Sequence, residues 1–277
     1  MTFDLETYRK TARPVATDDL DFEAFRRFPL DENVLRCIRF MHDVESHTVC
    51  YLRDLLMTAS HKDPSITTFL TMWNYEEYWH GVALGRVLDA HGEMSGAERI
   101  APMRRRLGVK DKISPLTNAL ASAALGEHFI AVHMSWGAVN EWSTRAGYER
   151  LAARAGHPVL TELLRRISQQ ETRHIAFYAS QARRRLAHAA VARRATRFAL
   201  QRLWAPVGSG VMPEAETHFL LRYLMGGRDG LAAARRIDAS IDKMPGLSGL
   251  GLVTGAVQAL GDGPTQPGAH SADRAAA

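Results

Sequence analysis

Two Glu-x-x-His motifs are the residues of this sequence best suited to chemistry. Glu77 is followed three positions later by His80, and Glu171 by His174. A spacing of three along a helix brings a carboxylate and an imidazole onto one face, so each motif can supply two ligands to a metal ion. Roughly one such motif is expected by chance in a chain with this content of Glu and His, but here there are two, both in apolar segments.

A lone glutamate precedes each motif on an earlier apolar segment. Glu45 lies 32 residues before Glu77, and Glu141 lies 30 residues before Glu171. These similar offsets predict two similar helix pairs that face each other. Four glutamates balance the charge of two ferrous ions, and a neutral cluster can be buried where four unmatched carboxylates cannot all stay ionised. The sequence therefore predicts a di-iron site whose ligands are Glu45, Glu77, His80, Glu141, Glu171 and His174. The alternative interpretation, with solvated glutamates and structural histidines, leaves the repeat unexplained.

Long amphipathic segments carry these ligands. Asp31 and Asp63 are good helix N-caps, and no convincing stretch alternates with a period of two. The long basic connection over residues 92–114 is typical of ferritin-like bundles. We therefore predict an all-α fold, a ferritin-like four-helix bundle with additional C-terminal helices. The predicted helices are 31–56, 63–92, 114–156 with a kink at Gly126 or Gly137, 158–186, 188–204 and two shorter ones over 214–244.

Length and composition favour one domain. A chain of 277 residues that is 46% hydrophobic can fill one large core, which we assign to residues 1–260. Residues 1–30 are predicted to be irregular, and the tail over 261–277 is predicted to be disordered. No stretch reaches about 18 uninterrupted apolar residues, and the start lacks the pattern of a signal peptide. We expect a cytoplasmic protein that does not span a membrane.

Positive charge is unevenly distributed along the chain. The net charge is +5, but no acidic residue occurs between Glu171 and Glu214, where arginines accumulate around Arg183, Arg184 and Arg185. A second cluster lies at 104–106. Such surfaces favour an acidic partner, although a solvated helix face explains them equally well. Nucleic acid is not an expected partner, because the basic runs lack interleaved aromatic residues.

The segments around the motifs resemble the soluble acyl-acyl-carrier-protein desaturases, a fatty acid desaturase family of the ferritin-like di-iron superfamily. Residues 156–178 resemble them most specifically: those enzymes read Asp-Glu-x-Arg-His where this chain has 170–174, with an isoleucine where Ile167 stands. Residues 76–81 resemble their Glu-Glu-Asn-Arg-His-Gly, and 141–144 their Glu-Arg-Ala-Thr. The resemblance extends over roughly residues 35–250.

The resemblance implies an oxygen-dependent di-iron oxidoreductase that desaturates a fatty-acyl thioester. Dioxygen is then a co-substrate, and an external electron donor of the ferredoxin type is required. It also implies an acyl carrier protein, or another acyl thioester, received by the patch around Arg183, Arg184 and Arg185, with Thr144 tuning oxygen activation beside Glu141. We also expect a homodimer. Gln170 departs from the family, whose aspartate at this position contacts a histidine ligand and is implicated in electron delivery.

Apolar residues near the motifs are candidates for the walls of a substrate pocket. Trp73, Ile130 and Met134 have the helical spacing of an apolar slot for an alkyl chain, and Gly137, one turn before Glu141, removes a side chain where oxygen or substrate must approach. Residues at this spacing are equally expected in an ordinary core.

Other functions share the same ligands. One is hydroxylation or N-oxygenation of a small metabolite, although Ile167 stands where N-oxygenases add a histidine ligand. Another is iron oxidation of the ferritin or rubrerythrin type, although storage cages need acidic inner surfaces. A metal-free remnant is disfavoured by the complete set of six ligands.

Overall fold

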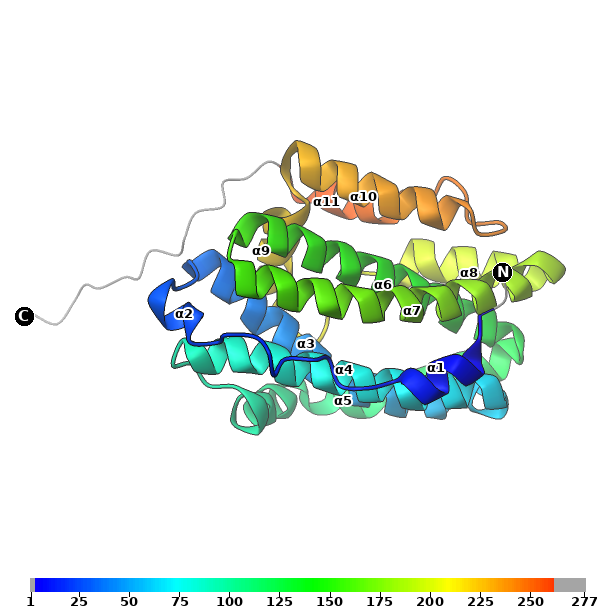
Figure 1. Ribbon diagram of the computed structural model, residues 1–277. Coiled ribbons are helices and arrows are strands. Elements are labelled where there is room, and N and C mark those ends of the chain that lie inside the picture. The colour runs from blue at the N-terminus through cyan, green and yellow to red at the C-terminus, as the bar shows by residue number, and fades with distance from the viewer. Residues whose placement is uncertain (1–2, 262–277) are drawn as a thin grey trace, which may run out of the picture.

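The computed structural model describes residues 3–261, apart from the side chains of 110–112, and within this range its regular elements are all helical (Figure 1). The all-α prediction is therefore confirmed. The elements are α1 (Leu5–Thr11), α2 (Ala24–Arg27), α3 (Glu32–Leu56), the 3-10 helix η1 (Ala59–Lys62), α4 (Pro64–Ala90), α5 (Gly96–Leu125), α6 (His128–Ala155), α7 (Pro158–His188), α8 (Ala190–Leu203), α9 (Glu214–Met225), α10 (Gly227–Asp242) and α11 (Leu252–Ala259).

Capping residues set the boundaries of the helices that carry the motifs. The Asp31 carboxylate accepts hydrogen bonds from the first turn of α3, and the Asp63 carboxylate does the same for α4, which has Pro64 at its first position. Gly156 ends α6 in the left-handed conformation, with φ of 59°. These boundaries follow the sequence prediction closely because each depends on a local signal.

The helices form two antiparallel pairs with a shared core. α3 packs on α4, and α6 packs on α7, so that the two pairs face each other across the interior. α8 and α10 pack on α6, and Figure 1 shows α10 and α11 as a further layer on the outside of the α6 and α7 pair. Large side chains that are fully buried fill the core, among them Ile38, Phe69, Leu84, Met134 and Tyr178.

The predicted helix over 114–156 is two helices, separated at Gly126, one of the two positions predicted for a kink. Gly126 has φ of 55°, and Leu120, in the last turns of α5 before it, is 71% exposed. The connection over 92–114 is largely helical, because α5 runs through it with an interruption at Gly108, where φ is 53°. A helix therefore makes the crossover between the two pairs.

The N-terminal and C-terminal segments hold further elements that the sequence did not predict. Residues 3–30 include α1 and α2, and α1 lies along α4 (Figure 1). α11 follows the two predicted helices over 214–244. The predicted disordered tail lies outside the described residues from 262 onward. Among the described helices, none is both long enough and apolar enough to cross a membrane.

Candidate metal centre

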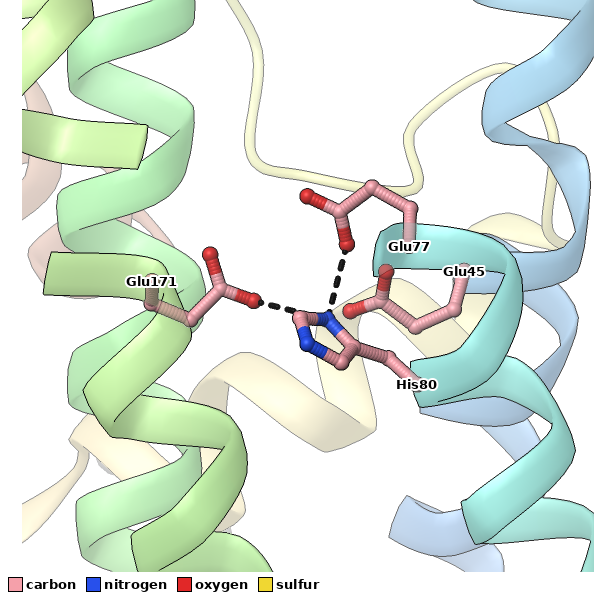
Figure 2. Close-up of side chains that lie close together, drawn as sticks. All are labelled: Glu45, Glu77, His80 and Glu171. Carbon is pink, nitrogen blue, oxygen red and sulfur yellow. Dashed lines mark hydrogen bonds and ion pairs between the residues drawn. The ribbon is translucent and has the colours of Figure 1, made fainter. Parts of the chain in front are cut away.

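The six predicted ligands meet between the two helix pairs. α3 contributes Glu45, α4 contributes Glu77 and His80, and Figure 2 shows these side chains approaching Glu171 of α7. Both histidines and Glu171 are completely buried, and the other three glutamates are at most 6% exposed. The structure therefore brings together every residue of the predicted ligand set: Glu45, Glu77, His80, Glu141, Glu171 and His174.

The ligand atoms form two groups that share two carboxylates. Glu45 and His80 belong to one group and Glu141 and His174 to the other, while Glu77 and Glu171 belong to both. Within each group, the ligand atoms all lie within 4.8 Å of one another. Such a set of oxygen and imidazole ligands suits two metal ions side by side, each with a terminal carboxylate and a histidine of its own.

The two shared carboxylates turn one oxygen toward each histidine. Glu77 places Oε2 at 3.0 Å from His80 Nδ1 and Oε1 at 3.1 Å from His174 Nδ1. Glu171 places Oε1 at 3.3 Å from His80 Nδ1 and Oε2 at 3.1 Å from His174 Nδ1. This is the arrangement of a bridging carboxylate, so the residues present fit a pair of metal ions.

Each terminal carboxylate is unfavourable as an anion in this cluster. Burial and the neighbouring Glu77 carboxylate raise the pKa of Glu45 well above its ordinary value. Burial and the neighbouring Glu171 carboxylate raise the pKa of Glu141 in the same way. Without cations, both groups therefore keep their protons.

The shared carboxylates raise the pKa values of the histidines, and the histidines lower those of the shared carboxylates. Burial acts against the protonated form of His80, but Glu77 and Glu171 raise its pKa well above the ordinary value. Burial also opposes protonation of His174, and its neighbours Tyr8 and Glu77 raise its pKa. Burial likewise acts against the anions of Glu77 and Glu171, but the two histidines lower both pKa values. The cluster is neutral with four protons, which two divalent ions can replace.

Each histidine has a different partner on the side away from the cluster. The Nε2 of His80 lies 2.7 Å from the Gln170 amide oxygen, and the Nε2 of His174 lies 2.9 Å from a carboxylate oxygen of Glu76. Because these oxygens can only accept from the rings, Nε2 carries the proton and Nδ1 is left to bind metal. Gln170 thus has the contact that the resemblance implied for the aspartate at its position.

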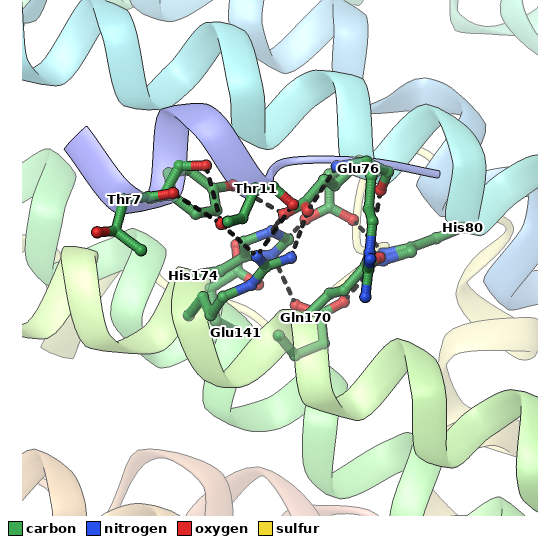
Figure 3. Close-up of polar contacts among 12 residues, drawn as sticks. Thr7, Thr11, Glu76, His80, Glu141, Gln170 and His174 are labelled. Atoms are coloured by element: carbon green, nitrogen blue, oxygen red, sulfur yellow. Dashed lines mark hydrogen bonds and ion pairs between the residues drawn. The ribbon is translucent and has the colours of Figure 1, made fainter. Parts of the chain in front are cut away.

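The N-terminal segment contacts both of these partners (Figure 3). The backbone N–H of Arg13 donates to Glu76 at 3.3 Å, and its carbonyl accepts from the Gln170 amide at 3.0 Å. The Tyr8 hydroxyl donates to Glu76 at 2.9 Å, and the Arg173 guanidinium pairs with the same carboxylate. Sequence reasoning singled out Gln170 but missed Glu76 and the N-terminal residues around it, for which the local signal was that Glu76 directly precedes Glu77.

The terminal carboxylates have aromatic hydrogen-bond donors. The Trp73 indole N–H donates to Glu141 at 2.9 Å, and the Tyr148 hydroxyl donates to Glu45. Trp73, predicted to line a substrate pocket, is buried and holds the Glu141 carboxylate through this bond. Both donors fix carboxylate orientation from the protein side of the cluster.

The remaining predicted pocket residues have different surroundings. Met134 is fully buried, and Ile130 borders a separate pocket near the start of α4. A Cβ on Gly137 would lie 2.3 Å from the Tyr178 ring, so this glycine accommodates the tyrosine and leaves no space for substrate. Thr144 is half-buried and lines an apolar pocket together with Glu45.

The predicted arginine patch is partly engaged in bonds within the protein. Arg185 pairs with Asp63 at 2.6 Å, Arg184 bonds Gln181 at 3.0 Å, and Arg183 is exposed. Arg104, in the other cluster, donates to the backbone carbonyl of residue 46 at 2.6 Å. The two clusters therefore border different parts of the bundle, at the start of α4 and at the middle of α3.

Comparison with known proteins identifies no family. No family model matches the chain, and no curated protein matches it at a significant level. The functional argument therefore depends on the geometry of the site.

Proposed function

We propose that this protein is an oxygen-dependent di-iron oxidoreductase. The observation that carries the proposal is the sharing of Glu77 and Glu171 between two buried histidines, with a further carboxylate at each end. A single structural metal ion would need only one of the two groups. Two adjacent redox-active ions, when bound, supply the chemistry that activates dioxygen for attack on an organic substrate.

The overall reactions open to such a site both require outside electrons. Hydroxylation takes one C–H bond, dioxygen, two electrons and two protons, and gives an alcohol and one water. Desaturation takes two C–H bonds with the same dioxygen, electrons and protons, and gives a double bond and two waters. Desaturation of a fatty-acyl thioester, as the resemblance implies, is the finer form of this proposal.

The protein surroundings supply orientation and exclusion of water. Trp73 and Tyr148 hold the terminal carboxylates, and burial keeps bulk solvent from the cluster. Thr144, on the same helix as Glu141, places a hydroxyl at the edge of an apolar pocket that includes Glu45. We assign to Thr144 the handling of a proton or of oxygen at this edge.

A basic pocket supports an acidic electron donor. It has a volume of about 650 Å³, lies between the N-terminal segment and α7, and includes Gln170, the partner of His80. Its cationic side chains are Lys10, Arg13, Arg165, Arg166 and Arg173, and its acidic one is Glu162. Four of these cations also form ion pairs within the protein: Lys10 with Glu6, Arg165 with Glu162, Arg166 with Asp19 and Arg173 with Glu76. A ferredoxin-type protein docked here would reach the cluster through Gln170, and its association would weaken as salt rises.

The test is the fate of dioxygen in the ferrous-loaded protein. With a reductant and an acyl substrate, oxygen consumption should be coupled to product, and the product mass should fall by two for desaturation or rise by sixteen for hydroxylation. Thr144→Val should keep the metal but uncouple oxygen consumption from product. Ser180→Ala is the matched control, because Ser180 bonds the carbonyl of Phe177 within its own helix, away from the pocket that Thr144 lines. Accumulation of ferric mineral without organic product would contradict the proposal.

A further inference from the structure

The part of α5 that follows its interruption exposes a row of large aliphatic side chains. Val109, Leu116 and Leu120 are more than half exposed, and Ile113 is nearly half exposed. Their spacing of four, three and four residues places them on one face of the helix. The row is about 16 Å long. Single exposed leucines are normal on a protein surface, but a contiguous row marks a surface that binds something apolar.

The polarity of this helix segment is opposite to that of a helix that packs on a core and faces water. On its inner side, Ser114 donates to a carboxylate of α3, and the Ser122 hydroxyl accepts from a backbone N–H of η1 at 2.7 Å. A surface helix normally turns its apolar face inward. α5 does so before Gly108, since Ile100 and Met103 are buried. After Gly108, polar contacts hold the helix on the protein and the aliphatic side chains face outward.

Basic residues precede the aliphatic row. Residues 98–112 include six cationic and two acidic residues, and the rest of α5 carries no charge. Two of the arginines bond within the protein, Arg99 to a carboxylate of α3 and Arg104 to a backbone carbonyl of α3. Arg105 and Arg106 are exposed just before the row. α5 thus presents uncharged aliphatic side chains next to exposed guanidinium groups, on the outside of the α3 and α4 pair (Figure 1).

An anionic lipid surface is the occupant that fits both parts of α5. Aliphatic side chains of an interfacial helix insert among lipid acyl chains, and exposed arginines bind the phosphates of the headgroups. A second copy of the chain on the same face would meet the arginines with its own basic run or with uncharged helix, and neither neutralises them. A nucleic acid would find no aromatic side chain in the row on which its bases could stack.

We propose that this protein binds to anionic membranes through α5, with Arg105 and Arg106 at the headgroup phosphates and the aliphatic row among the acyl chains: Val109, Ile113, Leu116 and Leu120. Only one side of α5 enters the lipid in this arrangement, so the bundle lies on the membrane surface. The binding does not depend on the metal centre, and it goes beyond the function proposed above.

Flotation of the full chain with lipid vesicles tests the aliphatic row. The chain should bind vesicles of phosphatidylcholine with about 30% phosphatidylglycerol more tightly than pure phosphatidylcholine, and less tightly as salt rises. Leu116→Ser with Leu120→Ser should weaken binding about 100-fold, because two leucines no longer leave water. Phe198→Ser with Leu203→Ser is the matched control, since these side chains of α8 are similarly exposed, and should bind unchanged.

A pair of charge-removing substitutions tests the headgroup contact. Arg105→Gln with Arg106→Gln should weaken binding to the anionic vesicles about 25-fold, because each arginine near an anionic surface contributes about fivefold. Binding to neutral vesicles should be unchanged. Arg235→Gln with Arg236→Gln, at exposed neighbouring positions of α10, is the matched control and should retain the affinity of the unaltered protein. Equal effects of the two pairs would show that net charge alone attracts the protein, and would overturn the placement at α5.

Analytical ultracentrifugation separates the lipid surface from a second copy of the chain. The variant with Leu116→Ser and Leu120→Ser should have the same association state as the unaltered protein. Dissociation of a dimer by these substitutions would assign the row to a subunit contact and overturn the proposal. Absence of binding to anionic vesicles, or equal affinity for neutral and anionic vesicles, would also overturn it.

Discussion

The two halves of the candidate metal centre have the same ligands but different surroundings. His80 is backed by the neutral amide of Gln170, whereas His174 is backed by the carboxylate of Glu76. Glu76 is itself held by Tyr8 and by Arg173. A carboxylate behind a histidine increases the basicity of the ring, and charged hydrogen bonds are stronger than neutral ones. The half with His174 should therefore bind metal more tightly, although each half offers the same ligand types.

The largest expected effect is the dependence of metal binding on pH, and it should be shared by both halves. The raised pKa values of Glu45 and His80 in one half, and of Glu141 and His174 in the other, mean that each ion displaces about two protons. Protons compete with metal, so affinity should increase as pH rises, by roughly 100-fold per unit for each ion where these groups are protonated.

Co²⁺ titrations at several pH values, combined with proton release in weak buffer, would measure these slopes. Release of about four protons per two ions is expected from the same exchange. Different slopes for the tighter and the weaker site would show that the halves differ in their ligands as well as in their partners.

Removing the carboxylate behind His174 should have the next largest effect. Glu76→Gln keeps the shape but removes the charge, which leaves Arg173 without its anion. Metal affinity of the tighter site should fall about 10-fold to 100-fold, the usual range for loss of such a partner. Isothermal titration with Co²⁺ would resolve the two sites. If the metal affinity of the tighter site is unchanged, Glu76 stabilises only the fold.

The smallest effect on metal affinity is expected in the half that contains His80. Gln170→Leu removes a neutral hydrogen bond to His80 and another to the carbonyl of Arg13. Affinity of the weaker site should fall about fivefold, because a neutral hydrogen bond contributes about 1 kcal/mol. A loss as large as that of Glu76→Gln would remove the distinction between the halves. Circular dichroism of the metal-free variants controls for unfolding.

The ligand set and most bundle helices could be predicted because their signals are local. Caps at Asp31 and Asp63 mark helix starts, and the spacing from Glu77 to His80 places both side chains on one face. The course of α5 was harder to predict from the sequence. Gly108 and an arginine-rich segment have the composition of a loop, but the neighbouring residues fold as helix.

Contacts between distant segments could not be predicted in this way. Nothing near Arg13 indicates that its backbone reaches the partners of two histidines more than 60 residues away along the chain. The predicted slot beside Gly137 failed for a related reason, since helical spacing does not specify that the Tyr178 ring fills that space. The apolar pocket lined by Glu45 and Thr144 depends on how α9 and α11 pack against α3 and α6, which no single helix encodes.

Iron stoichiometry after anaerobic ferrous loading tests the central claim most directly. The account predicts about two irons per chain, because the ligands form two groups. Glu171→Ala removes a shared carboxylate and should lose at least one iron, whereas Glu127→Ala, at an exposed position, should retain both. Elemental analysis that finds no iron in the unaltered protein, or both irons in Glu171→Ala, would contradict the two-metal centre.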